Sequence, residues 1–136
     1  MAFTALATRL YKDPITTVYL NSLKQNDDYF IKGVAKAWVN FDGSTATMTS
    51  RAAHGVTNIT DNAIGKYTIT FTTGFASTGY CRVLGGEGTP GAVRGYLTIN
   101  LTAIATTAIQ VIGWDDNGGT NIDHRDVNVA CFGVTV

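Results

Sequence analysis

The residues best suited to chemistry lie around Trp114, which is followed by two carboxylates and an amide. A ring can stack on the apolar face of a sugar, while carboxylates and amides hydrogen-bond its hydroxyl groups. Tyr96 and Arg94 are further candidates of the same kind. We therefore predict a ligand-binding site, with a glycan as the ligand class, made of Trp114, Asp115, Asp116, Asn117, Tyr96 and Arg94.

Trp114 has an alternative, purely structural role. Its ring could close the end of the hydrophobic core, with the indole N–H donating a hydrogen bond to a carbonyl group. That role is the commoner one for a tryptophan, and both stay open at this point.

Segment 115–123 is also dense in oxygen-bearing side chains, which suggests Ca²⁺. It departs from an EF-hand loop, because Gly119 stands at the fifth position, Thr120 at the sixth and Asp126 at the twelfth. A hairpin turn explains the same residues. We therefore predict no metal site here, and no cofactor.

The chain contains little that could form a catalytic triad. Its two histidines, His54 and His124, lie in no recognisable motif. Because His124 lies between Asp123 and Arg125, we predict a solvated or salt-bridged surface cluster there, and a structural role for His54. We expect no catalytic residues and no enzyme activity. A small glycan-cleaving enzyme that uses paired carboxylates is a less favoured alternative.

The elements that position these residues are predicted to be strands. Tyr67, Ile69 and Phe71 alternate with threonines, as in a half-buried strand. Segment 60–62 is predicted to be a turn and segment 85–91 a long loop. The candidate strands are 35–41, 46–51, 66–72, 79–84, 93–101, 107–114 and 127–135. Their spacing predicts an all-β domain over residues 31–136, an antiparallel β-sandwich or barrel.

Residues 1–30 are predicted to form an N-terminal arm with a short helix at 14–24. Asp13 is a strong N-cap, and Pro14 fits the first helical position. One face of this helix is apolar and requires a partner. Its residues, predicted to form an oligomer or attachment interface, are Ile15, Val18, Tyr19 and Leu23.

The composition of the chain limits the classes of partner that it can bind. Ten basic and ten acidic residues give a net charge of zero, which argues against nucleic acid. Charged residues make up 15% of the chain, against about 25% in ordinary soluble domains, while 45% of the residues are hydrophobic. This balance predicts assembly with copies of the same chain. No apolar run approaches the roughly 20 residues of a membrane span, so we expect no membrane insertion.

Three tracts resemble a known family. They are Lys36-Ala37-Trp38-Val39-Asn40-Phe41-Asp42-Gly43, residues 58–73, and Asp126-Val127-Asn128-Val129-Ala130-Cys131-Phe132-Gly133. Together they resemble a module of bacteriophage tail-fibre and other virion structural proteins, with the pattern KAWVNFxG…ITDNGxGxYTxxFTT…VNVAxFG. The resemblance covers about residues 34–136.

The resemblance implies a virion protein that assembles as a homotrimer, with Trp38 in the core or the subunit interface. Its expected role is that of a tail fibre or fibre tip that contacts host-surface glycan, while the N-terminal arm attaches to other virion proteins. A head decoration or head-fibre protein on the capsid is the alternative.

Cys81 and Cys131 both fall in strand-like tracts, and a disulfide and two unpaired thiols stay open as alternatives. An aliphatic residue commonly stands at the Cys131 position in the resembled pattern. This favours two thiols that act as small hydrophobic side chains.

Overall fold

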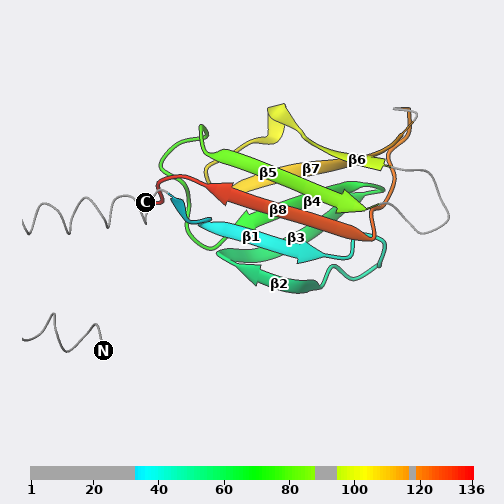
Figure 1. Cartoon of the computed structure of the whole chain (residues 1–136), viewed down its shortest axis with the longest axis horizontal. Coiled ribbons are helices and arrows are strands. Elements are labelled where there is room, and N and C mark those ends of the chain that lie inside the picture. Colours follow the sequence, from blue (N-terminus) through cyan, green and yellow to red (C-terminus); the bar gives the residue numbers. More distant parts are fainter. Residues whose placement is uncertain (1–32, 88–94, 117–118) are drawn as a thin grey trace, which may run out of the picture. The chain divides into compact units, whose positions relative to one another are not determined.

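The computed structural model of the chain describes residues 33–87, 95–116 and 119–136. Within them the chain forms two four-stranded sheets in which every strand pair is antiparallel (Figure 1). The first sheet has the order β2-β1-β8-β5, with bounds Ser50–His54, Ala37–Phe41, Asp126–Phe132 and Cys81–Glu87. The second has the order β3-β4-β7-β6, with bounds Val56–Ala63, Lys66–Phe71, Ala108–Asp115 and Gly95–Ile99. A short 3₁₀ helix, Leu101–Ala103, follows β6.

The core lies between the two sheets and comes from the alternating residues of their central strands. β1 and β4 bury every second side chain, as their apolar alternation predicts. Phe41 of β1 meets Tyr67 of β4 edge to face, with ring centroids 5.3 Å apart. The central strands contribute Ala37, Val39, Phe41, Val127, Val129, Cys131, Tyr67, Ile69, Phe71, Ile109 and Val111. The prediction of an all-β sandwich is confirmed, and Val34–Val136 form one compact unit.

The edge strands differ from the predictions. Residues 60–62, predicted to be a turn, belong to β3, whose only buried residue is Ile59. β2 buries none of its residues and lies at 50–54, whereas the prediction was 46–51. Because an exposed edge strand needs no apolar alternation, its sequence looks like a polar connection. β5 likewise continues to Glu87, into the segment predicted to be a loop.

Two glycines allow the chain to turn where another residue would be strained. Gly55 joins β2 to β3 and so carries the chain from one sheet to the other, with φ = 65°. Gly65 forms the β3–β4 hairpin with φ = 64°. Both values lie in the left-handed region, which glycine adopts without steric cost.

Cys81 and Cys131 form no disulfide. Cys81 pairs with Phe132 while its neighbour Arg82 pairs with Cys131, so the two thiols lie on opposite faces of the sheet. Cys131 is buried in the core, and burial raises the pKa of its thiol to about 12. Cys81 is exposed on the outer face.

Several predictions concern residues outside the described ranges. These are the helix at 14–24 with Ile15, Val18, Tyr19 and Leu23, and the candidate ligand residues Arg94 and Asn117. In the ranges that are described, no helix is long and apolar enough to cross a membrane.

Candidate functional site

A buried hydrogen-bond network at one end of the sandwich fixes the segment that follows β7. Asp123 Oδ1 accepts a hydrogen bond from Gly65 N at 2.6 Å and lies 3.1 Å from the hydroxyl of Tyr67. The Tyr67 hydroxyl also accepts from the backbone N–H of His124 and lies 3.1 Å from the Gly43 carbonyl oxygen. Burial raises the pKa of Tyr67, which therefore stays a neutral phenol. The network holds residues 122–124 against the β3–β4 hairpin.

His124 contradicts the predicted surface cluster, because its side chain is 0% exposed. Among the described residues, neither ring nitrogen has a hydrogen-bond partner of normal geometry. Burial lowers the pKa of His124, and the nearby carbonyls of Trp114 and Glu87 offset only part of this effect. The ring fits because a Cβ at Gly113 would lie 2.4 Å from its Cδ2, and one at Gly95 2.6 Å from its Cε1. The surface prediction was wrong because it was based on the charged residues on either side of His124 in the sequence.

Register brings two rings and an amide into one row on the outer face of the second sheet. Trp114 pairs with Tyr96 on one side and forms an isolated bridge with Asn121 on the other. Residues directly opposite in antiparallel pairs share a face, so all three side chains point outward together. The next row along the same face contains Lys66, Ile112 and Thr98. We call Lys66, Tyr96, Trp114, Thr120 and Asn121 the Trp114 site.

Trp114 does not close the core. Its side chain lies on the outer face, half-buried, and its indole N–H donates to the Thr98 hydroxyl at 2.8 Å. This bond fixes the ring on the sheet. Tyr96 beside it is 47% exposed. Two aromatic rings are thus presented to solvent from rigid strands, as stacking on a sugar requires.

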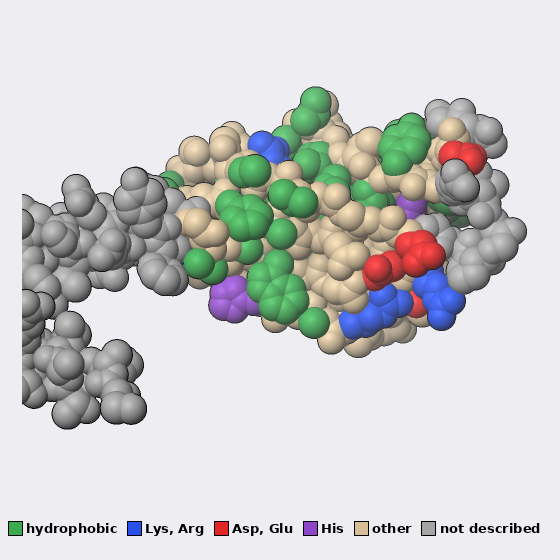
Figure 2. All heavy atoms as spheres, viewed as in Figure 1, with side chains coloured by type: hydrophobic (Ala, Val, Ile, Leu, Met, Phe, Trp, Pro, Cys, Tyr) green, Lys and Arg blue, Asp and Glu red, His purple; other side chains and the backbone are tan. Residues whose placement is uncertain are grey.

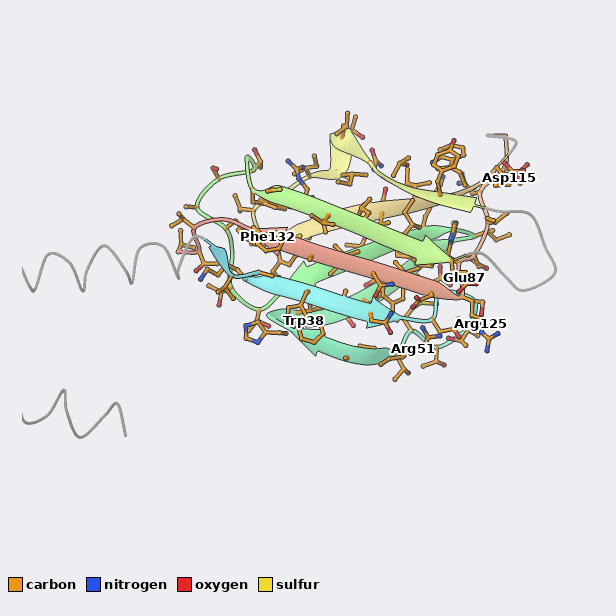
Figure 3. All side chains as sticks on the ribbon, in the orientation of Figure 1. Trp38, Arg51, Glu87, Asp115, Arg125 and Phe132 are labelled. Atoms are coloured by element: carbon orange, nitrogen blue, oxygen red, sulfur yellow. The ribbon has the colours of Figure 1, made fainter. Side chains whose placement is uncertain are left out.

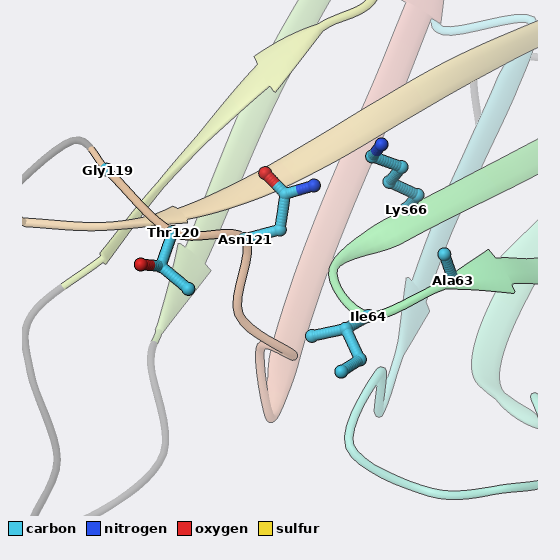
Figure 4. Close-up of a pocket in the computed structure, with 6 residues that line it drawn as sticks. All are labelled: Ala63, Ile64, Lys66, Gly119, Thr120 and Asn121. Atoms are coloured by element: carbon cyan, nitrogen blue, oxygen red, sulfur yellow. The ribbon is translucent and has the colours of Figure 1, made fainter.

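A hollow with a volume of about 480 Å³ opens beside this row (Figure 4). It lies between the tip of the β3–β4 hairpin and the segment after β7. The side chains of Asn121 and Lys66 rise on the same side of the hollow in Figure 4. Its lining residues are Ala63, Ile64, Lys66, Gly119, Thr120 and Asn121. This hollow supplies a cation, an amide and a hydroxyl at its border.

The predicted acidic ligands behave differently from Trp114 and Tyr96. Asp115 Oδ1 accepts hydrogen bonds from the backbone N–H groups of Gly119 and Thr120, at 3.0 and 3.3 Å. Its carboxylate therefore shapes the turn, as the hairpin interpretation of this segment predicted. Asp116 is exposed beside it. No group of three His, Cys, Asp or Glu side chains that could hold a metal occurs among the residues that the structure describes.

Sequence reasoning missed Lys66, Thr120 and Asn121. Lys66 is far along the chain from Thr120 and Asn121, and only the register of β4 and the bridge at Trp114 bring it close to them. The sequence did contain one signal for Lys66. It precedes the buried Tyr67 by one residue in a strand, so its side chain must point to the outer face.

The outer face of the first sheet is apolar over one half. Trp38 is 39% exposed there, so the core position is wrong and the interface position stays a prediction. Register places Trp38 beside Ala130, which pairs in turn with Val83. Val83 is 54% exposed. We call Trp38, Cys81, Val83, Ala130 and Phe132 the Trp38 patch. Figure 2 shows these apolar side chains gathered over β1, β8 and β5.

The other half of this face is polar and internally paired. Arg51 forms ion pairs with Asp126 at 2.9 Å and with Asp42 at 3.1 Å. The Asn40 amide donates to Asn128 Oδ1 at 2.8 Å and also to Asp126. A hydrogen bond from the Ser44 hydroxyl lowers the pKa of Asp42. Figure 3 shows Arg51, Glu87 and Arg125 at this end, away from Trp38 and Phe132.

No protein-family model matches the chain, and neither curated proteins nor solved structures show a significant similarity to it.

Proposed function

We propose that this chain is a structural protein of a bacteriophage virion, a tail-fibre or fibre-tip subunit that assembles with copies of itself and contacts host-surface glycan. The Trp38 patch is the observation that carries this proposal. The sequence resemblance over residues 34–136 supports the virion location and the three-fold assembly. On this proposal the protein acts by binding and has no catalytic role.

The patch supports self-association because it exposes apolar side chains with few polar groups among them. Trp38 and Val83 lie in one cross-strand row with Ala130 between them. Apolar surface of this kind is stabilised by burial at about 25 cal/mol per Å², and contiguous exposed patches mark interaction sites. Tryptophan is also prominent among the residues that dominate interface energies.

The paired polar half beside the patch supports a defined interface. Its carboxylates, amides and guanidinium already satisfy one another, so burying its edge would leave few unpaired groups. On the proposal, the patch buries against neighbouring subunits, and the Trp114 site, on the other sheet, faces the host. The N-terminal arm, residues 1–30, attaches the assembly to other virion proteins.

Copy number and position in intact particles test the proposed location. Quantitative gels give the copy number, and imaging with an antibody against the β-domain gives the position. A few trimers at the tail are expected. Hundreds of copies over the head would favour the decoration alternative, and absence from purified particles would contradict the virion proposal.

Incubation of the protein with host polysaccharide tests the proposal that it only binds. We expect the chain length and viscosity of the polysaccharide to stay unchanged after prolonged incubation. Progressive shortening would favour the glycan-cleaving alternative.

A further inference from the structure

We propose that the Trp114 site binds an acidic saccharide, with the Lys66 ammonium pairing with the carboxylate of a uronic or sialic acid unit. The inference rests on the proposed glycan contact and narrows the class of glycan.

Lys66 gives the Trp114 site a positive charge. In the part of the chain that the structure describes, both ion pairs belong to Arg51, and the Lys66 ammonium has neither an ion-pair nor a hydrogen-bond partner. Lys66 is half-buried at the border of the hollow. An ammonium group at the border of a hollow, with no carboxylate partner among the described residues, is complementary to an anion, and hydrogen bonds to a charged group are roughly twice as strong as neutral ones.

Thr120 and Asn121 add neutral hydrogen-bonding groups to the site. The backbone N–H and carbonyl of Thr120 both bond Asp115, at 3.3 and 3.0 Å, which fixes the segment. The Thr120 hydroxyl has no hydrogen-bond partner among the residues that the structure describes. The Asn121 amide has no hydrogen-bond partner within the described ranges. A hydroxyl and an amide can both donate and accept, which matches the hydroxyl groups of a sugar.

The hollow and the adjoining aromatic rings set the shape of the site. The hollow of about 480 Å³ lies within the range of small-molecule sites, about 300–1,000 Å³, and is open to solvent. An open hollow admits one unit of a polymer whose chain continues across the surface. Trp114 and Tyr96 occupy the adjoining row and supply faces for the next unit.

The experiment measures binding of the full-length protein to immobilised uronate- and sialate-containing bacterial polysaccharides and to the carboxyl-reduced form of each. Each pair of polysaccharides differs only in the acid group, so the wild-type protein alone tests the inference. The variants are Lys66→Gln and Tyr96→Ala. The control is Lys36→Gln, which removes the same charge just before β1 in the other sheet. Thermal melting checks that each variant is folded.

The expected result is binding to at least one acidic polysaccharide and at least about tenfold weaker binding to its carboxyl-reduced form, as loss of one charge-assisted hydrogen bond implies. Lys66→Gln should weaken acidic binding by a similar factor, and Lys36→Gln by less than about twofold. Tyr96→Ala should weaken binding to both forms.

Three results would overturn the inference. They are absence of binding to every acidic polysaccharide, equal binding to the native and reduced forms, and equal losses in Lys66→Gln and Lys36→Gln. Equal binding to both forms would leave the proposed glycan contact standing and reject only the acidic class. The location in particles is tested separately and is unaffected by any of these results.

Discussion

The two outer faces of the sandwich differ in how their polar groups are used. On the first sheet, Arg51, Asp42 and Asp126 pair with one another, and the remaining half presents apolar side chains around Trp38. On the second sheet, Lys66 and Asn121 have no partners among the described residues, and the rings of Trp114 and Tyr96 lie beside them. A face with satisfied polar groups and bare apolar surface suits a protein partner. A face with unsatisfied donors and rings suits a hydroxylated ligand.

The largest effect is expected from Trp38→Asp, which places a charge in the apolar patch. We expect the free energy of self-association to become less favourable by about 3 kcal/mol or more, as for a central interface residue. The matched control is Tyr96→Asp, the same kind of change on the other face, which should leave association intact. Sedimentation velocity of both variants checks the prediction. If the two variants dissociate equally, the assignment of the faces is wrong.

Tyr67→Phe should weaken the Trp114 site without touching the Trp38 patch. It removes the hydroxyl that bonds His124 N and contacts Asp123, which leaves buried polar groups unsatisfied and lowers the free energy of unfolding by about 1–3 kcal/mol. Tyr80→Phe is the control, because that hydroxyl donates to Ala105 and Ala108 carbonyls at the far end of the sandwich. Urea unfolding measures both losses.

Saccharide binding separates the two tyrosine variants. Tyr67→Phe should also reduce binding, since the segment that lines the hollow loses a support, whereas Tyr80→Phe should not. Equal binding by both variants would show that the buried network does not position the site.

Lowering the pH should reduce the stability of the protein through His124, which is buried at one end of the sandwich. Because burial lowers the folded-state pKa of His124, the unfolded chain takes up a proton below about pH 6.5 while the folded protein resists it. Stability should therefore be full above pH 6.5 and fall progressively as the pH drops from there toward the folded-state pKa. Asp123, beside the ring, and the Glu87 and Trp114 carbonyls oppose the shift in part.

Thermal melting of a His54→Gln variant between pH 7.5 and 5 measures this effect with a single histidine left in the chain. NMR of the remaining imidazole gives the decisive signal. Protonation of the folded-state ring at or above pH 6.5 would contradict the buried position of the ring.

The smallest effect is expected from Arg51→Met. Its two ion pairs are exposed, with side-chain exposures of 43% for Arg51 and 25% and 37% for Asp42 and Asp126. Such pairs contribute about 0–1 kcal/mol each. Melting temperature should fall by a few degrees at most, and association should persist. Loss of association would show that the interface extends over the polar half of the face.

The parts of the fold that follow an apolar period were predictable from sequence. Tyr67, Ile69 and Phe71 alternate with threonines, and the structure buries all three. β3 escaped prediction, because an edge strand with one buried residue needs no apolar period and contains the turn-forming Asp61 and Asn62.

The candidate site was predictable only in part. Trp114 and Tyr96 stood out as rings near polar residues, and the structure pairs them across β6 and β7. Lys66 and Asn121 join them through strand register, which local sequence does not encode. The prediction of a surface position for His124 was wrong because it was based on the charged residues on either side of it. One of them, Asp123, turns its carboxylate inward and accepts a hydrogen bond from Gly65 N.

Sedimentation equilibrium of the full-length wild-type protein shows whether the Trp38 patch is a self-association surface. We expect a mass of three chains at micromolar concentration, falling to one chain in Trp38→Asp at the same concentration. A mass of one chain for the wild-type protein throughout the accessible concentration range would contradict this expectation.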